Sequence, residues 1–239
     1  MSFWQEVVNL LFPPACVCCG ELIDATVDLC HACEKKWDAW RAHRCPKCGH
    51  PAPVCNCLPS RRRSRADDRI FYAFFYDSHD EECIANRLIY GLKQEDDRHL
   101  IRFLASCLAN TVISSARMYG IDLSEYKITY PPRSWWAKNR YGFDHTRLLA
   151  HALSQELGIP VIKTLTRSGI RVQKTLTAKK RYENAARSYR VAKNTALNGQ
   201  KLILLDDVIT SGATLTVCEA LLYTAGAEDV LLCALAKDI

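Results

Sequence analysis

The sequence predicts an α/β protein with a mainly parallel sheet flanked by helices and a small cysteine-rich domain at the amino terminus. After residue 70, short apolar runs rich in β-formers alternate with longer helical patterns, as in sheets whose parallel strands are joined by helices. Before residue 58 lie nine of the thirteen cysteines, and the basic run of residues 61–65 follows them. We therefore expect a cysteine-rich domain with a basic linker over residues 1–66 and the α/β domain over residues 67–239.

The composition is typical of a folded protein in a reducing compartment. The chain has 239 residues, of which 49% are hydrophobic, enough for a core of ordinary size. Its first residues lack the basic segment of a secretory signal, and no apolar stretch approaches the roughly 18 residues of a membrane span. We therefore expect a cytoplasmic protein with metal-bound thiols. The apolar segment of residues 3–12 is predicted to pack on its own domain; the alternative is peripheral binding at the inner face of the membrane.

The early cysteines are paired at metal-ligand spacing. A Cys-x-x-Cys turn places two sulfurs on one side of a tight bend, and two such turns complete a tetrahedral zinc site. Sequential grouping is the simplest, although interleaved pairing stays open and Cys18 could replace a neighbour. A segment this short has little core, so zinc would supply much of its folding energy. The expected ligands of two structural Zn²⁺ ions are Cys16, Cys19, Cys30 and Cys33, then Cys45, Cys48, Cys55 and Cys57.

Basic charge is concentrated in two places. The linker contains four arginines, and it is either a solvated hinge or a contact for a phosphate backbone. Residues 127–193 contain fifteen Lys or Arg against three Asp or Glu, a net +12, whereas the whole chain is +6. We favour a polyanion site over solvated helix faces, because the stretch includes a proline loop after a predicted strand. The linker arginines are Arg61, Arg62, Arg63 and Arg65.

The α/β domain is expected to open with an aromatic, β-prone strand, followed by two helices with apolar faces. A second strand runs into the proline loop, at the carboxyl end where α/β sheets bind ligands. The expected elements are strands at residues 70–76 and 127–130, and helices at residues 84–92, 100–112 and 148–157, the last ended by Gly158. The later cysteines are interpreted as small buried hydrophobes: Cys83, Cys107, Cys218 and Cys233.

The last predicted unit carries the chemistry. Residues 202–205 form an aliphatic strand suited to burial on both faces, and Asp206 and Asp207 follow, where two carboxylates are costly unless they serve a ligand. Small and hydroxylated residues come next, ahead of a helical pattern at residues 215–225, so free amides at the helix start can cradle a phosphate. An ordinary capped strand-to-helix turn is the alternative. We call these residues the phosphate loop: Thr210, Ser211, Gly212, Ala213 and Thr214.

The strand, acidic pair and loop resemble the motif with which type I phosphoribosyltransferases bind phosphoribosyl pyrophosphate (PRPP). The resemblance implies that Asp206 and Asp207 face the ribose hydroxyls, directly or through Mg²⁺, and that the phosphate loop binds the 5-phosphate. It also implies that pyrophosphate lies near the proline loop. The further PRPP-binding residues that it implies are Pro131, Pro132, Arg133 and Arg140.

Most of the chain resembles the ComF family, which includes GntX. The shared order is cysteine pairs, Tyr-Gly-Leu-Lys at residues 90–93, a proline loop, Arg-x-Gly-Phe, Gln-x-x-Leu at residues 173–176, Arg-x-x-Asn at residues 181–184, and the PRPP motif. Family members look like phosphoribosyltransferases fused to a zinc ribbon, and some are associated with natural competence or the use of external DNA. The chain departs from the family at residues 140–145, where Asp144 and His145 replace an amide pair, and at Ser211, which keeps a hydroxyl.

The resemblance implies an enzyme that displaces pyrophosphate from the ribose anomeric carbon, with positioning and electrostatics as the main catalytic effects. Thr210 stands where 6-oxopurine phosphoribosyltransferases have an acidic residue, so we expect neither hypoxanthine nor guanine as acceptor. A PRPP sensor without turnover is the alternative. The implied partners include the DNA-transport machinery of competent cells.

A second hypothesis is a module that binds single-stranded DNA and uses the fold as a nucleotide-responsive platform. Cations would follow the phosphates, and aromatic side chains between them would stack on bases. The alternative is that the tryptophans belong to a core or a lid. The candidate residues, besides the linker arginines, are Trp135, Trp136 and Lys138.

Overall fold

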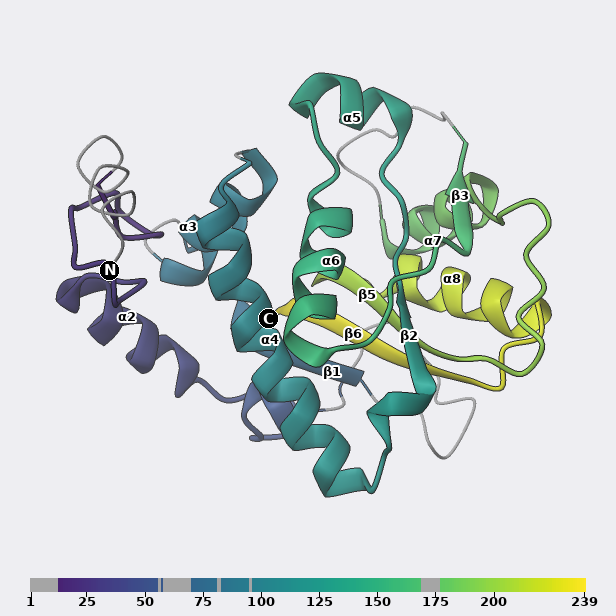
Figure 1. Ribbon diagram of the computed structural model, residues 1–239, viewed down its shortest axis with the longest axis horizontal. Helices are drawn as coiled ribbons and strands as arrows, with labels where there is room; N and C mark the ends of the chain where they lie inside the picture. The colour runs from purple at the N-terminus through teal and green to yellow at the C-terminus, as the bar shows by residue number, and fades with distance from the viewer. Residues whose placement is uncertain (1–12, 56, 58–69, 81–82, 95, 169–176) are drawn as a thin grey trace.

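The computed structural model describes residues 13–55, 57, 70–80, 83–94, 96–168 and 177–239. Its centre is a four-stranded parallel sheet with the strand order β1-β6-β5-β2 (Figure 1). The central strands carry continuous apolar runs, at residues 202–205 and 230–236, as expected where both faces of a sheet are covered. The predicted mainly parallel sheet is confirmed. Its strands are β1 Ile70–Tyr76, β2 Tyr126–Thr129, β5 Lys201–Ile209 and β6 Asp229–Asp238.

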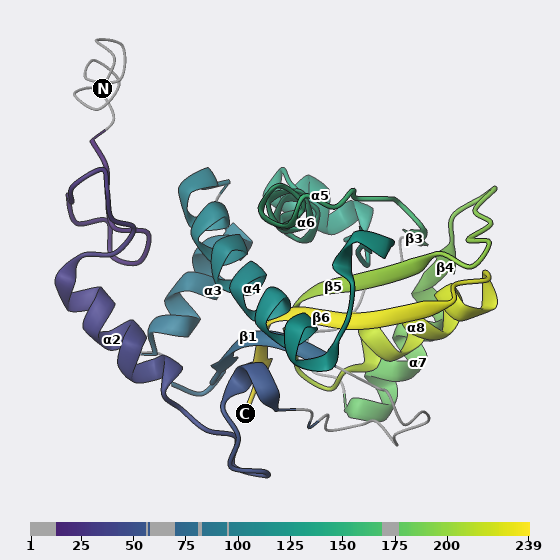
Figure 2. The same ribbon diagram turned by 60° about the horizontal axis from the view of Figure 1, so that its bottom comes forward.

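Helices cover both faces of this sheet (Figures 1 and 2). One face packs under α3, α4 and α6 through strand side chains such as Phe74 and Ile203. The opposite face packs on α8, which in turn contacts α7, through alternate side chains such as Tyr72 and Leu204. The period of two in the strands thus divides the core into two layers. The helices are α3 Ile84–Gln94, α4 Arg98–Tyr119, α6 His145–Leu157, α7 Ala178–Ser188 and α8 Ala213–Thr224.

Local side chains explain where α6 begins and ends. Asp144 accepts a hydrogen bond from the amide of Arg147, which satisfies one of the free donors of the first turn. Gly158 ends the helix in the left-handed conformation with φ 69°, as its position in the sequence predicted. The cap makes His145 the first residue of α6.

Smaller elements lie outside the main sheet. The strands β3 Leu165–Arg167 and β4 Tyr189–Val191 form a separate antiparallel pair. The short turn η2 Leu123–Glu125 precedes β2. The helix α5 Trp135–Tyr141 follows the proline loop and was not predicted. It includes residues 140 and 141, the first two residues of the stretch that departs from the ComF pattern.

The cysteine-rich part docks on the edge of the sheet formed by β1. It contains α2 His31–Arg41 and the 3-10 turn η1 Ala52–Val54. The ring of Trp37 meets that of Phe74 edge-on at 4.9 Å, and Trp40 Nε1 donates to the carbonyl of Phe75 at 2.6 Å. The two parts therefore share apolar core. The basic linker and residues 3–12 lie outside the described residues.

The four later cysteines differ in burial. Cys83, Cys218 and Cys233 are buried, as predicted. Cys107 is only half-buried, since it lies on the side of α4 that faces the cysteine-rich part beside a hollow lined by Trp37 and Arg41. Among the helices that the structure describes, none has the length and apolar character needed to cross a membrane.

Candidate functional site

The acidic pair lies near the carboxyl end of β5, which continues two residues beyond it to Ile209. Asp207 is the better-partnered member. Its Oδ2 lies 2.7 Å from His145 Nε2 and 3.5 Å from Lys93 Nζ, and its Oδ1 accepts from the amide of Val208 at 2.7 Å. Burial opposes ionisation, but the Lys93 ammonium and His145 outweigh it and hold the pKa of Asp207 well below its usual range. Asp207 is therefore a carboxylate.

Asp206 has the opposite environment. Burial, and then the charge of Asp207, raise the pKa of Asp206 well above its usual range. Two adjacent, partly buried carboxyl groups cannot both ionise cheaply. Asp206 is therefore harder to ionise than Asp207, although its Oδ1 accepts a hydrogen bond from the amide of Asp207 at 3.0 Å.

The phosphate loop connects β5 to α8. Gly212 adopts the left-handed conformation with φ 73°, which a side chain would strain, and α8 begins at the next residue. The first amides of α8 thus stay free to bind an anion. Arg181 of α7 reaches the loop, where its Nη1 donates to Thr210 Oγ1 at 2.9 Å. The Arg181 guanidinium therefore places a positive charge beside the phosphate loop, which contains no basic residue.

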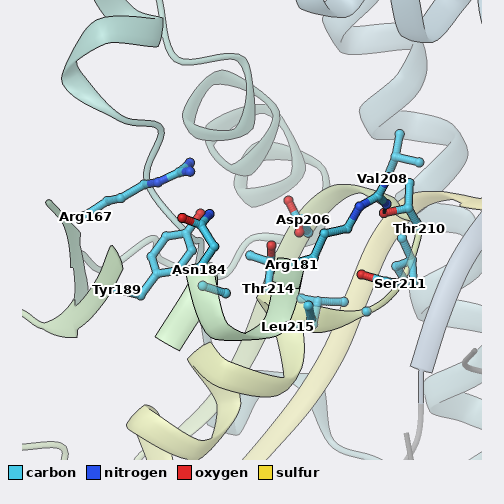
Figure 3. Close-up of a pocket in the computed structure, with 14 residues that line it drawn as sticks. Arg167, Arg181, Asn184, Tyr189, Asp206, Val208, Thr210, Ser211, Thr214 and Leu215 are labelled. Carbon is cyan, nitrogen blue, oxygen red and sulfur yellow. Dashed lines mark hydrogen bonds between the residues drawn. The ribbon is translucent and has the colours of Figure 1, made fainter. Parts of the chain in front are cut away.

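A cavity of about 380 Å³ lies between the phosphate loop and the small β3-β4 sheet (Figure 3). Its far wall is formed by Arg167, Asn184 and Tyr189, and the guanidinium of Arg167 lies 5.1 Å from the centre of the Tyr189 ring. Asp206 lines the same cavity from β5. The sequence-predicted carboxyl group and phosphate loop thus meet in one hollow.

A second hollow of about 340 Å³ adjoins the first and shares Arg167, Tyr189 and Asp206 with it. Cations from three elements line it together with both members of the acidic pair. The predicted proline loop is therefore brought to the acidic pair. The other lining residues include Pro131, Pro132, Arg133, Lys93 and His145.

Several of these residues were not predicted as part of the site. Lys93 stood in the Tyr-Gly-Leu-Lys motif and Arg181 in Arg-x-x-Asn, so the motifs could have indicated both. His145 was noted only as a departure from the family. Nothing in the sequence around Arg167 distinguishes it from other basic residues.

The nucleic-acid candidates are only partly described. Trp135 and Trp136 are each 59% exposed and meet edge-on with ring centres 5.0 Å apart, so the alternative of core packing is wrong. Lys138 Nζ lies 2.9 Å from Asp144 Oδ2, an ion pair that ties α5 to the cap of α6. The side chain of Arg140 and all four linker arginines lie outside the described residues.

The eight paired cysteines form two clusters. In each, the four sulfurs lie within 4.8 Å of one another, and the grouping is sequential rather than interleaved. Cys18 belongs to neither cluster. Four thiols so close together fit tetrahedral zinc, and the chain has two Cys₄ zinc-binding sites. The first cluster is Cys16, Cys19, Cys30 and Cys33, and the second is Cys45, Cys48, Cys55 and Cys57.

The first cysteine of each cluster has a lowered pKa, which favours metal binding. Burial opposes ionisation of Cys45, yet amide hydrogen bonds from Lys47 and Cys48 lower its pKa to about 6. Burial likewise opposes ionisation of Cys16, and hydrogen bonds from backbone amides, including those of Cys30 and Cys18, lower its pKa to about 7. These amides stabilise the thiolate, the form that binds Zn²⁺.

Comparisons with known proteins agree with the two-part organisation. A model of the double zinc ribbon domain matches residues 7–64. Competence protein F of Haemophilus influenzae is 27% identical over 234 residues, 92% of this chain and 95% of that protein. The DNA utilization protein YhgH of Salmonella typhimurium is 26% identical over 205 residues, 83% of this chain and 86% of that protein.

Phosphoribosyltransferases also align with parts of the chain. The adenine phosphoribosyltransferase of Treponema denticola is 33% identical over 86 residues, 36% of this chain and 45% of that enzyme. The solved hypoxanthine-guanine phosphoribosyltransferase of Bacillus anthracis aligns with a TM-score of 0.37 and 14% identity, over 57% of this chain and 68% of that chain. The chain is a relative of competence protein F and the YhgH proteins, as its resemblance to the ComF family predicted.

Proposed function

We propose that the two adjoining hollows bind PRPP, or a related ribose 5-phosphate, with Mg²⁺. The observation that carries the proposal is the meeting of the phosphate loop, Arg181 and Asp206 around one cavity. Free amides of α8 and the Arg181 guanidinium would bind the 5-phosphate. The acidic pair would face the ribose hydroxyls and accept hydrogen bonds from them.

The second hollow suits a pyrophosphate group. Lys93, Arg133 and Arg167 all line it. His145 also lines this hollow, beside Asp207. Asp206 and Asp207 offer the oxygen ligands that Mg²⁺ prefers, and the ion would offset the charge of the pyrophosphate. These residues would hold Mg²⁺ with the substrate.

Transfer of the phosphoribosyl group is the reaction that this arrangement supports. Cations around the pyrophosphate would stabilise it as it leaves the anomeric carbon, and the walls would exclude water. By its resemblance to 6-oxopurine phosphoribosyltransferases, the chain has Thr210, hydrogen-bonded to Arg181, where those enzymes have an acidic residue, so we expect no 6-oxopurine acceptor. A nucleobase panel with pyrophosphate release as readout tests this, and rapid turnover of hypoxanthine would contradict it.

Calorimetric titration with PRPP tests binding directly. Arg181→Gln removes a charged donor and should weaken binding about 10- to 100-fold. Arg187→Gln is the matched control, since Arg187 lies on the same helix, is exposed and lines neither hollow. Asp207→Asn and omission of Mg²⁺ should each weaken binding as well. Equal affinity in wild type and both site variants would exclude the proposed site.

We propose binding of single-stranded DNA as a second function, and the exposed pair Trp135 and Trp136 favours it. The names of the relatives, a competence protein and DNA utilization proteins, agree with such a role. The pair follows the proline loop within the net +12 stretch of residues 127–193. Base stacking on exposed aromatic rings contributes about 1–3 kcal/mol per base without sequence preference.

Fluorescence anisotropy with a labelled oligonucleotide separates the two functions. Changing both tryptophans to alanine should weaken strand binding at least about tenfold, whereas Tyr90→Ala, an exposed aromatic outside the basic stretch, should not. Binding should weaken with salt, and changing the four linker arginines to Gln should reduce that dependence. It should survive Asp207→Asn. An absence of binding at low salt would leave only the sugar-phosphate function.

A further inference from the structure

Lys237 is a buried lysine in an unusual position. It lies in β6, is 3% exposed, and forms no ion pair with a carboxylate within the described residues. A buried ammonium group without a counter-charge is costly. Something other than a carboxylate must therefore compensate it.

The nearest candidates are the sulfurs of the second cysteine cluster. Lys237 Nζ lies 3.8 Å from Cys45 Sγ and 3.8 Å from Cys55 Sγ. The rings of Tyr72 and Phe75 form the rest of its surroundings, with centres 5.7 Å and 5.8 Å from the nitrogen. The ammonium group is thus held between two aromatic rings and directed at two metal-binding sulfurs.

The charges of a zinc site complete the argument. Four thiolates around one Zn²⁺ leave an excess of negative charge, and this cluster is largely removed from water, with Cys45 and Cys55 fully buried. The Lys237 ammonium can donate hydrogen bonds to two of those sulfurs and offset part of the charge. The buried cation and the buried anionic cluster each need the other.

Tyr72 of β1 adds a second donor. Its hydroxyl is buried and has no hydrogen-bond partner within the described residues. Tyr72 belongs to the same cluster of buried residues as Cys45 and Cys55, and the centre of its ring lies 5.7 Å from Lys237 Nζ. A bound thiolate would accept the hydrogen bond that the phenol lacks.

We propose that Lys237 and Tyr72 are the outer shell of the second zinc site, so that the sheet of the α/β domain and the cysteine-rich part build this site together. Figure 2 shows the segment after α2 lying beside the carboxyl terminus, where β6 ends. Lys237 pairs in register with Ile209 of β5, the residue before the phosphate loop, and with Phe75 of β1. The metal site is thereby fixed to the strand that carries the candidate sugar-phosphate site.

Competition for zinc by a chromophoric chelator tests the proposal, with the first cluster as an internal control. Lys237→Met keeps the length and apolar stem of the side chain but removes the charge. It should lower the affinity for one of the two zinc ions about 10- to 100-fold, as loss of an outer-shell partner does, and leave the affinity for the other unchanged. Alkylation mapped by mass spectrometry should show faster modification of the second cluster alone.

Two more variants distinguish charge from packing. Lys237→Arg retains a cation and should keep most of the zinc affinity. Tyr72→Phe removes only a hydroxyl and should lower the affinity for the same zinc ion severalfold. This variant tests the proposal if Lys237→Met does not fold. Three outcomes would overturn the proposal. The zinc affinity could be unchanged in Lys237→Met or Tyr72→Phe, or it could fall equally at both clusters. Lys237→Arg could also lose as much zinc affinity as Lys237→Met.

Discussion

Two buried charges lie on neighbouring strands of the sheet, and they are balanced by different means. Asp207 of β5 has two partners from the α/β domain itself, the ammonium group of Lys93 and the imidazole of His145. Lys237 of β6 has two cysteine sulfurs of the other part of the chain near its nitrogen, and no carboxylate forms an ion pair with it in the part of the chain that the structure describes. The first charge is balanced by side chains alone, whereas the second is balanced only when those sulfurs are thiolates.

This difference separates a binding site from a structural one. A sugar phosphate or Mg²⁺ would enter a hollow whose carboxylate is already partnered, so the domain can fold before its ligand arrives. Zinc at the second cluster instead fixes the thiolates that Lys237 faces, so the metal is part of the fold. Disturbing the second charge should therefore cost more stability than disturbing the first.

The largest effect is expected from Cys55→Ser. Cys55 is fully buried in the second cluster, and loss of its thiolate would release zinc and leave Lys237 without compensation. We expect a loss of about 4 kcal/mol or more, or roughly 10 °C in Tm. Calorimetry of the whole chain measures it.

Elemental analysis supplies the control for this prediction. The wild-type protein should contain two zinc ions per chain and Cys55→Ser only one. Cys19→Ser removes an exposed ligand of the first cluster and should affect the α/β domain less. Equal losses of Tm in the two variants would show that both clusters support the sheet alike.

An intermediate effect is expected at Asp207. His145→Ala removes one of its partners from a site where both side chains are largely buried. Breaking a buried pair leaves an uncompensated charge, but Lys93 remains, so we expect a loss of about 2 kcal/mol. Urea unfolding at pH 7 measures it.

The chain contains a matched control for this pair. His99 Nε2 lies 2.7 Å from Asp28 Oδ1, the same distance as His145 Nε2 from Asp207 Oδ2, but both of those side chains are far more exposed. Exposed ion pairs contribute little, so His99→Ala should cost less than about 1 kcal/mol. If the two variants lost equal stability, burial would not be what distinguishes the Asp207 site.

Local patterns predicted the elements that are continuous in the sequence. The strand, acidic pair and phosphate loop occur within one short stretch, and the apolar face and Gly158 predicted α6. The cysteine spacing likewise predicted two clusters. In each case neighbouring residues supply the necessary signal.

The rest depends on contacts between distant segments. Lys93, His145 and Arg167 meet only after three separate elements have packed, and no spacing rule connects them. Lys237 comes after the apolar residues 230–236 of β6, at a position where a charged residue ordinarily marks the return to solvent. Its burial results from docking of the cysteine-rich part, which the strand sequence does not encode.

The smallest effect, and the one of opposite sign, is expected from Asp206→Asn. The folded pKa of Asp206 is raised, so its contribution to stability is present below its unfolded pKa of about 4 and is lost as the pH rises toward the folded value. An amide stays neutral at every pH and removes the repulsion by Asp207, so the variant should be more stable than wild type by about 1 kcal/mol at pH 8 and nearly equal to it at pH 4. Asp207→Asn is the control of opposite sign: the pKa of Asp207 is held far below 4, so its stabilising contribution is present at both pH values, and this variant should be less stable than wild type at pH 4 as well as at pH 8. Urea unfolding at the two pH values measures both. If Asp206→Asn were less stable than wild type at pH 8, Asp206 would be ionised and partnered in the folded protein. The contrast drawn here between Asp206 and the partnered carboxylate of Asp207 would then be wrong.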